Sequence, residues 1–403
     1  MSRVFFLLVI AVLPVQLSKF FFLDHSFVLG IPIDYRAAAL YLSDIAIVMF
    51  TIAAILENRK RIVVIAARYK DYIAALAVFN LYLFFSAVFF SVSPPASYFF
   101  SLKFFIFSLF SIAAAVALQN RRVGQNGLLV LGISVFWQAL LLIAQFARQG
   151  AIGLQILGER SFDAGTVQIA HSQLAGRQFL RPYGTFPHPN VAAAYLAFSL
   201  IILFGAAGAQ KRKLAPARII LAITTILAVF LTFSKSAIAV LLLGVLATVK
   251  SLPRLLLLLL PVAIIGFFAA SQLWANLAPV AERLLLSQAA LDIALINPAF
   301  GVGAANFILE LARLDLVSLS ETRLLQPVHN VFLLILAENG IFGLMIFAAL
   351  LLVVARYLQG RTKTVIFIGL LLYLSLDHFL WTLQQGQMMF FLTLAYIVSQ
   401  SKK

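Results

Sequence analysis

The stretch "VHNVFLLILAENGIFGLMIFAALLLV" at residues 328–353 is almost entirely apolar over a length that suits a membrane-crossing helix. A hydrocarbon core of about 30 Å is crossed by roughly 20 helical residues, fewer than this stretch contains. Similar stretches recur along all 403 residues, of which 63% are hydrophobic and 11% are charged. This composition predicts an integral membrane protein and excludes an ordinary soluble domain.

The apolar segments predict a helical bundle. They run for roughly 16 to 24 residues and lack the alternation of apolar and polar residues that marks a membrane β-barrel. We expect one transmembrane domain over residues 1–403, an all-α polytopic bundle of about twelve helices. The expected helices lie near residues 3–22, 38–56, 71–92, 97–119, 126–147, 189–209, 217–233, 235–250, 255–270, 328–353, 364–381 and 386–400.

The positive charges set the expected topology. The net charge is +16, but the basic residues gather in alternate short loops, at 59–70, 121–122, 211–218, 250–254, 356–363 and 402–403. This is the positive-inside pattern, so it predicts a multi-pass protein of the cytoplasmic (inner) membrane with both termini cytoplasmic. With topology accounting for the charge, no basic stripe remains for nucleic acid. The absence of cysteine excludes disulfides and thiolate sites.

Two extracytoplasmic loops are long, at about residues 149–188 and 271–327. The second contains "VAERLLLSQAALDIALI" at 280–296, whose apolar residues recur three and four positions apart. Such spacing predicts an amphipathic helix that lies at the membrane surface.

Cationic residues collect on the side of these loops. Several cations with few acids beside them favour an anionic ligand, and a lipid phosphate or diphosphate fits because guanidinium groups match phosphate oxygens. The bland alternative is that the cations pair with acids of the same loops, such as Glu159 and Asp292, or with lipid headgroups. The cations in question are Arg177, Arg181, Lys235, Arg283 and Arg323.

Histidine and asparagine residues accompany the cations. His329 lies at the start of the helix expected at 328–353. An imidazole of near-neutral pKa at this position can act as a general base or simply cap the helix. Asn330 can cap or bind sugar hydroxyls. His188 lies between Pro187 and Pro189, with Asn190 directly after them, and it has a structural or a ligand-binding role. Asp377 and His378 form a second polar pair, either lining the substrate or making a buried ion pair.

The sequence lacks the residue spacings that are typical of metal ligands. No His-x-x-x-His, Glu-x-x-His or outward Asp-x-Asp pattern occurs, so we expect no metal and no cofactor. If the protein catalyses a transfer reaction, the arginines would therefore stabilise the negative charge that develops on the leaving group.

Three segments together resemble the O-antigen ligase and O-antigen polymerase superfamily. They are "RPYGTFPHPNVAAAYLAF" (181–198), "LTFSKSAIAV" (231–240), and "NPAFGVGAANF" (297–307) followed by "HNVFLLILAENGIFGL" (329–344). The resemblance implies a GT-C-like, inverting, metal-independent glycosyltransferase. Such an enzyme takes a glycan from a polyprenyl diphosphate, such as undecaprenyl diphosphate, on the periplasmic or outer face and passes it to an acceptor hydroxyl.

The resemblance also implies roles for single residues. His329 takes the position of the family's essential histidine, and Arg283 that of the arginine expected to hold the diphosphate. The third position departs from the family, because Lys235 stands where an arginine usually follows the serine, and the bidentate fork is lost. Arg181, Arg177, Arg323, Asn330, His188 and Asn190 are expected to line the substrate site.

Three classes of protein are considered, and the first is the ligase or polymerase. A ligase and a polymerase of surface polysaccharide differ only in the acceptor, which is another lipid-linked glycan for a polymerase and a lipid A core, a protein or a peptidoglycan-type polymer for a ligase. A twelve-helix transporter or flippase of lipid-linked glycans is the main competitor, although transporters usually hold their polar residues near the bilayer midplane. A membrane scaffold without chemistry is the third.

Overall fold

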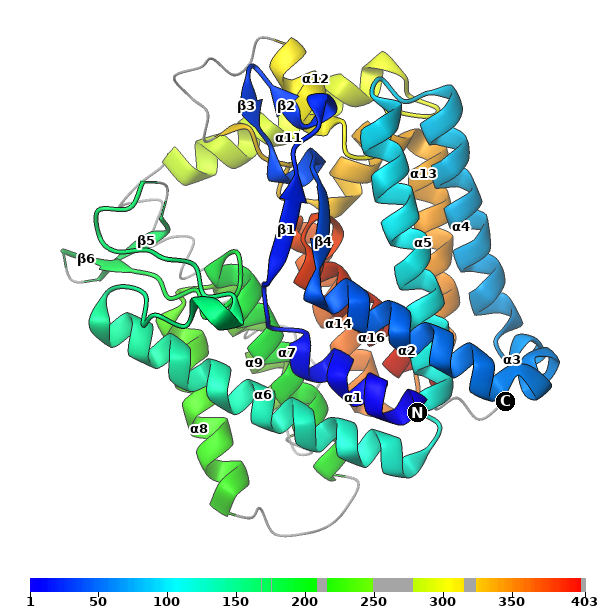
Figure 1. Cartoon of the computed structure of the whole chain (residues 1–403). Helices are drawn as coiled ribbons and strands as arrows, with labels where there is room; N and C mark the ends of the chain where they lie inside the picture. Colours follow the sequence, from blue (N-terminus) through cyan, green and yellow to red (C-terminus); the bar gives the residue numbers. More distant parts are fainter. Residues whose placement is uncertain (168, 175, 209–215, 249–277, 315–323, 400–403) are drawn as a thin grey trace.

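The computed structural model describes residues 1–167, 169–174, 176–208, 216–248, 278–314 and 324–399, and it is mostly helical (Figure 1). Four helices are long and apolar enough to cross a membrane: α4 (Lys70–Phe89), α5 (Pro94–Ala117), α6 (Arg121–Arg148) and α13 (Val331–Ala355). Shorter apolar helices accompany them. The predicted helical membrane protein is thereby confirmed at this level.

Most of the expected helices have a counterpart. The expected segment 255–270 lies outside the described residues, so the number twelve stays a prediction, as does the GT-C-like fold. The further helices are α1 (Ser2–Val12), α2 (Leu42–Asn58), α3 (Ile62–Arg68), α7 (Pro189–Gly208), α8 (Pro216–Leu231), α9 (Lys235–Thr248), α14 (Gly360–Leu376), α15 (Phe379–Thr382) and α16 (Gln384–Ser399).

Three small antiparallel sheets correct the expectation of an all-α chain. The strand β1 (Ser18–Phe21) pairs with β4 (Ala38–Tyr41), β2 (Phe27–Val28) with β3 (Ile31–Pro32), and β5 (His171–Leu174) with β6 (Arg177–Leu180). The first expected helix, 3–22, is therefore wrong beyond Val12. Pro14 explains the early end, because it has no amide hydrogen to donate to the Ile10 carbonyl and its ring would clash with that carbonyl in a continued helix.

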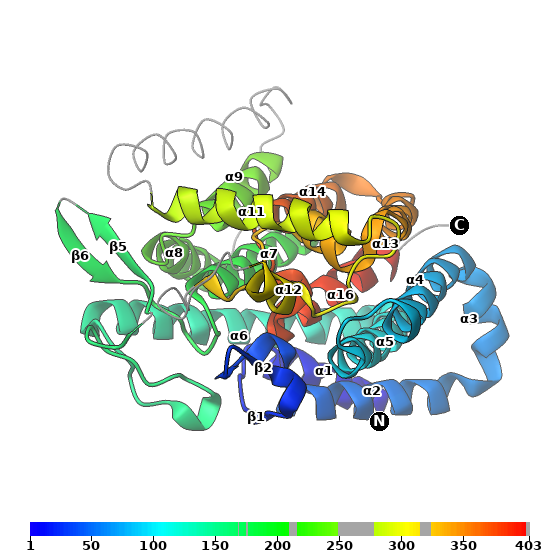
Figure 2. The ribbon, with the colours of Figure 1, turned by 90° about the horizontal axis from the view of Figure 1, so that it is seen from above.

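The first long loop carries the β5–β6 hairpin, and the second carries two helices, α11 (Ala278–Ile296) and α12 (Phe307–Arg313). Viewed from above, α11 runs across the top of the bundle (Figure 2). It buries Leu286, Ala289 and Ile293 and exposes Leu284 and Leu295. The predicted amphipathic helix at 280–296 is therefore present.

The helix α13 is broken where the sequence turns polar. Gly340 has a φ of 63° and a ψ of −171°, a conformation open essentially to glycine alone. The segment "NPAFGVG" lies against this break, where the Val302 and Gly303 amides donate to the Ala337 and Glu338 carbonyls, and the Ile341 amide donates to the Pro298 carbonyl. Non-helical backbone at membrane depth is tolerated when protein satisfies its polar groups in this way.

We expect Gly340→Ala to destabilise the protein by roughly 2–4 kcal/mol, because a Cβ at this φ is strained and would collide with the Ala299 carbonyl. The measurement is the thermal unfolding midpoint in detergent. Gly124→Ala is the matched control, since a Cβ on Gly124 meets no atom within 4 Å. Equal midpoints for the two variants would contradict the strained break.

Candidate active site

A hydrogen-bonded chain joins one predicted cation to a buried carboxylate. Arg181, in the loop before α7, donates from Nη2 to Asn190 Oδ1 (2.7 Å) and from Nε to the Thr232 carbonyl at the end of α8 (2.6 Å). Asn190 in turn donates from Nδ2 to Asp377 Oδ2 (3.0 Å), just after α14. Residues far apart in the sequence thus meet at one place, with Asn190 as the bridge.

Two histidines complete the carboxylate's surroundings. His329 Nδ1 lies 3.6 Å from Asp377 Oδ1, and the His378 backbone amide donates to the same oxygen (2.8 Å). The rings of His329 and His378 have their centroids 5.2 Å apart. His329 Nδ1 is buried and has no hydrogen-bond partner among the described residues. Because this nitrogen is buried, its neighbouring acceptor is the Asp377 carboxylate rather than a molecule that enters from outside.

Two further predicted cations lie beside this cluster. Arg283, on α11, donates from Nη1 to the Leu376 carbonyl at 3.5 Å, immediately before Asp377. Lys235 is the first residue of α9, and the charges of Arg283 and Arg181 both act on it. Like charges repel, so three cations held this close favour an anionic ligand.

Local sequence explains how some of these side chains are placed. Pro189 opens α7 at the position where a missing amide costs nothing, and His188 Nδ1 accepts from the Asn190 amide at 3.1 Å. Asn330 is the N-cap of α13, where its Oδ1 accepts from the Leu333 amide. The capping role left open for Asn330 is thus present, while a role in substrate binding stays a prediction.

An aromatic core fixes the segment that carries Asp377 and His378. Trp381 on α15 is 2% exposed and packs against Phe100, Phe104 and Phe347, with ring centroids 5.1–5.4 Å apart. Aromatic pairs at such distances stabilise the arrangement beyond their buried area. The α14–α15 connection is therefore held rigidly against α5 and α13.

The charge states of the cluster follow from burial. Burial lowers the pKa of Arg181 to about 10, so it stays protonated at neutral pH. Burial and then the charge of Arg181 lower the pKa of His188 to about 3, so it stays neutral. Burial alone would raise the pKa of Asp377, but its interactions with His329 and His378 outweigh this and lower it. Asp377 is therefore an anion, and Asn190 joins it to the Arg181 guanidinium.

We expect the free energy of unfolding to fall as the pH drops from about 6.5 toward 3, by at most about 1.4 kcal/mol per pH unit from His188. In this window the unfolded histidine, with its ordinary pKa of 6.5, binds a proton that the folded one excludes. His188→Gln should flatten the pH dependence of the thermal midpoint. His171→Gln is the control on β5, and an identical flattening there would contradict the assignment.

One predicted site residue lies away from the cluster in the described part of the chain, and a second lies outside that part. Arg177 begins β6 and is exposed, on a hairpin whose partner for Arg177 is Leu174. Arg323 lies outside the described residues. The interpretation of both as substrate-binding residues therefore stays a prediction.

Sequence reasoning left the role of Asp377 and His378 undecided. The ligand atoms of His329, Asp377 and His378 lie within 4.8 Å of one another, a group that could hold a metal ion. No motif spacing signals this group, because its members come from two chain segments that only folding brings together. The adjacent acid and histidine at 377–378, in an otherwise apolar region, were the one available hint.

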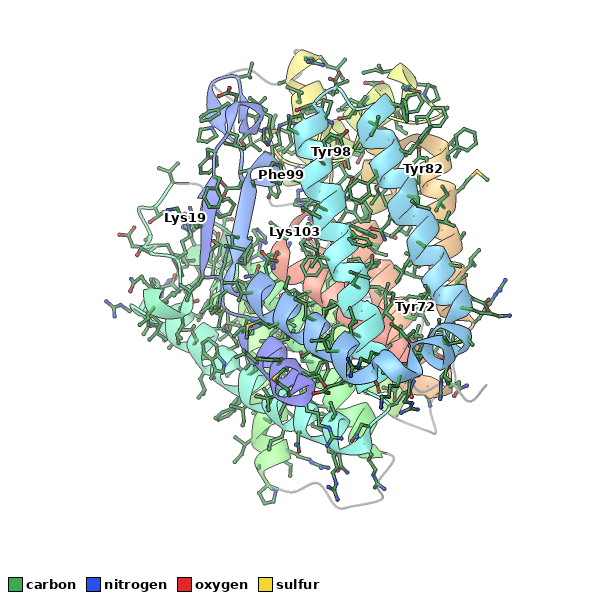
Figure 3. The ribbon with its side chains drawn as sticks, turned by 45° about the vertical axis from the view of Figure 1, so that its right-hand side comes forward. Lys19, Tyr72, Tyr82, Tyr98, Phe99 and Lys103 are labelled. Carbon is green, nitrogen blue, oxygen red and sulfur yellow. The ribbon has the colours of Figure 1, made fainter. Side chains whose placement is uncertain are left out.

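A cavity of about 440 Å³ lies next to His378, and two of its lining residues contact this histidine. Its lining includes Tyr35, whose ring meets that of His378 edge-on at 5.5 Å, and Thr382, whose hydroxyl lies 2.7 Å from His378 Nδ1. The other walls come from α2, α5 and β4, and Phe99 and Lys103 lie on the side of α5 that faces β4 (Figure 3). This cavity combines an apolar wall with polar groups next to His378.

These features define a class: an integral membrane protein of bundled helices that assembles a cationic, histidine-containing site from separate segments. Residues 190–348 match the model of the O-antigen ligase family, which confirms the resemblance to the O-antigen ligase and polymerase superfamily. The match indicates an O-antigen ligase-like membrane enzyme. It covers Asn190, Lys235, Arg283 and His329, while Arg181 and Asp377 lie outside it. No curated protein matches the chain.

Proposed function

We propose that the protein is an inverting, metal-independent glycosyltransferase of the outer face of the cytoplasmic membrane. It moves a glycan from a polyprenyl diphosphate to an acceptor hydroxyl, as a ligase or polymerase of surface polysaccharide. The observation that carries this proposal is the gathering of Arg181, Lys235 and Arg283 beside His329 and Asp377. A fold alone would not support it, because function resides in the site.

The cations suit the donor. Attack of a hydroxyl on the anomeric carbon breaks the bond to the diphosphate, which leaves with the electron pair of that bond. Fixed positive charges close to the departing oxygens lower the barrier because they meet charge that develops in the transition state. Arg283 is exposed, and its contact to the Leu376 carbonyl is long at 3.5 Å, so its guanidinium can turn to a diphosphate.

His329 suits the role of general base. Its side chain is partly exposed, at 21%, so an acceptor hydroxyl can reach the imidazole. On taking the hydroxyl proton the ring becomes a cation, and the ionised Asp377 at 3.6 Å stabilises that cation. The acceptor oxygen then bonds to the anomeric carbon as the diphosphate departs.

The cavity beside His378 suits the acceptor. The cations reach the histidine pair through Asn190 and Leu376, whereas the cavity reaches it through Tyr35 and Thr382. Donor and acceptor would therefore approach His329 from different groups of residues. The apolar residues of α2 and α5 in the wall, such as Ile45 and Ile106, favour an acceptor that carries a lipid.

The direct test is incubation of the purified protein with a synthetic polyprenyl-diphosphate oligosaccharide and a lipid-linked acceptor, with products identified by mass. Transfer of the glycan with inversion at the anomeric carbon supports the proposal. The competing flippase would instead move the labelled lipid-linked glycan across a vesicle membrane without transferring it, and this result would contradict the proposal.

We expect glycan transfer to persist in excess EDTA, because the arginine and lysine cations stabilise the leaving group without a metal. The rate is measured before and after chelation and again after adding Mg²⁺ or Zn²⁺. Loss of transfer on chelation with recovery on adding a metal would instead assign a metal to His329, Asp377 and His378.

A further inference from the structure

A second cavity, of about 550 Å³, lies among α1, α6, α7, α14 and α16. The residues that line it include Leu118 and Arg121 at the α5–α6 junction and Gly360 at the start of α14. The helix α14 begins at Gly360 and ends beside Asp377. The Gly360 end of the cavity therefore lies about 24 Å along that helix from the candidate active site, at 1.5 Å per residue. It is therefore a separate feature of the molecule.

The walls of this cavity are apolar and aromatic. They are built mainly by Phe6, Leu131, Phe198, Ile202 and Leu392. Ligand pockets of roughly 300–1,000 Å³ with such walls hold chain-like or ring-like apolar groups. A small inorganic anion would leave this wall without a partner, whereas a lipid chain would cover it.

The polar part of the lining carries one sign of charge. It contains Arg121, Arg361 and Lys363, and none of its described residues is an aspartate or glutamate. Lys363 is 4% exposed, donates from Nζ to the Ile397 carbonyl at 2.5 Å and lies 5.9 Å from the centroid of the Tyr396 ring. Both of these partners are uncharged. A buried ammonium among apolar helices usually has an anionic partner, and none is seen for Lys363 within the described residues.

We propose that this cavity binds an anionic glycerophospholipid, with an acyl chain against the apolar wall and the phosphate at Arg121 and Lys363. Basic pockets between membrane helices recognise anionic headgroups by charge and by guanidinium–phosphate hydrogen bonds. The cavity lies at the end of the bundle where the basic loops 121–122 and 356–363 meet, the end expected to face the cytoplasmic leaflet. This site does not depend on the proposed glycan transfer.

The test is native mass spectrometry of the purified protein titrated with phosphatidylglycerol or with phosphatidylcholine of the same acyl chains. We expect one phosphatidylglycerol to bind in preference to phosphatidylcholine. Arg121→Gln combined with Lys363→Met should weaken this binding roughly tenfold or more, as expected for the loss of charge-assisted hydrogen bonds. Arg122→Gln is the matched control, since Arg122 neighbours Arg121 but does not line the cavity.

A second variant tests the acyl chain without removing a charge. Gly124 lines the cavity, and a Cβ there meets no atom within 4 Å, so Gly124→Leu should fill the space and also favour the helix. We expect it to displace phosphatidylglycerol while the thermal midpoint of the lipid-free protein stays level or rises. Equal binding of the two lipids, binding unchanged in both variants, or stronger binding of inorganic phosphate or farnesyl diphosphate would each overturn the proposal.

Discussion

His329→Ala is expected to lower the rate of glycan transfer roughly 10²- to 10⁴-fold, the range that a general base contributes. The physical reason is the loss of a partly exposed group that can receive the acceptor proton and share the resulting charge with Asp377, 3.6 Å away. Folding should be unaffected, because His329 Nδ1 has no hydrogen-bond partner among the described residues. The measurement is the single-turnover rate with a synthetic donor.

The matched control for this variant is His171→Ala. His171 lies on β5, outside the hydrogen-bonded cluster of the described residues. Its rate and its elution profile in detergent should equal those of the unmodified protein. Normal transfer by His329→Ala would remove the histidine from the mechanism, and an equal loss in His171→Ala would point to a general defect.

Arg283→Ala is expected to cost roughly 10²- to 10³-fold in transfer, as the loss of one fixed charge-stabilising group does in other enzymes. Arg283 is exposed, and within the described residues its guanidinium makes a long contact of 3.5 Å to the Leu376 carbonyl, so its removal should leave the thermal midpoint unchanged. Arg283→Lys should recover part of the rate, because the charge remains while the bidentate fork is lost. The rates are measured with saturating donor.

Arg177→Ala separates this effect from general electrostatics. Arg177 carries the same charge on an exposed hairpin and, in the described part of the chain, makes no contact with the cluster. Its removal should change the rate less than about threefold, since exposed charges are screened within a Debye length of about 10 Å. If both variants lost activity equally, the position of Arg283 beside Asp377 would have no special role.

Composition and periodicity predicted much of the fold because they depend on one physical requirement. Helical segments in a bilayer must be apolar and must satisfy their own backbone hydrogen bonds. The break at Phe233–Lys235, predicted from a polar interruption, is present. The break predicted near Gln384 to Gln387 occurs earlier, on either side of the short α15, because α16 already begins at Gln384. The β1–β4 hairpin was missed because "SKFF" is apolar enough to extend a helix in any hydropathy window.

The candidate site was predictable only in part. The uneven distribution of charge singled out Arg181, Lys235, Arg283 and His329, because cations without nearby acids are unusual on the side of the membrane expected to be extracytoplasmic. The role of Asp377 was left undecided because its partners, Asn190 and His329, are distant in the sequence and belong to other segments of the chain. A hydrogen bond between side chains depends on distances of about 3 Å, which no linear spacing of residues encodes across separate helices.

Apolar composition was enough to predict a helical membrane protein, since burial in lipid selects apolar residues by type. The side of the membrane that each charged residue faces stays a prediction. Folding was needed to bring together the cluster of Arg181, Asn190, Asp377 and His329 and to place "NPAFGVG" against the broken α13. The reason is that these contacts depend on how helices pack against one another, and packing is fixed by the shapes of many side chains together.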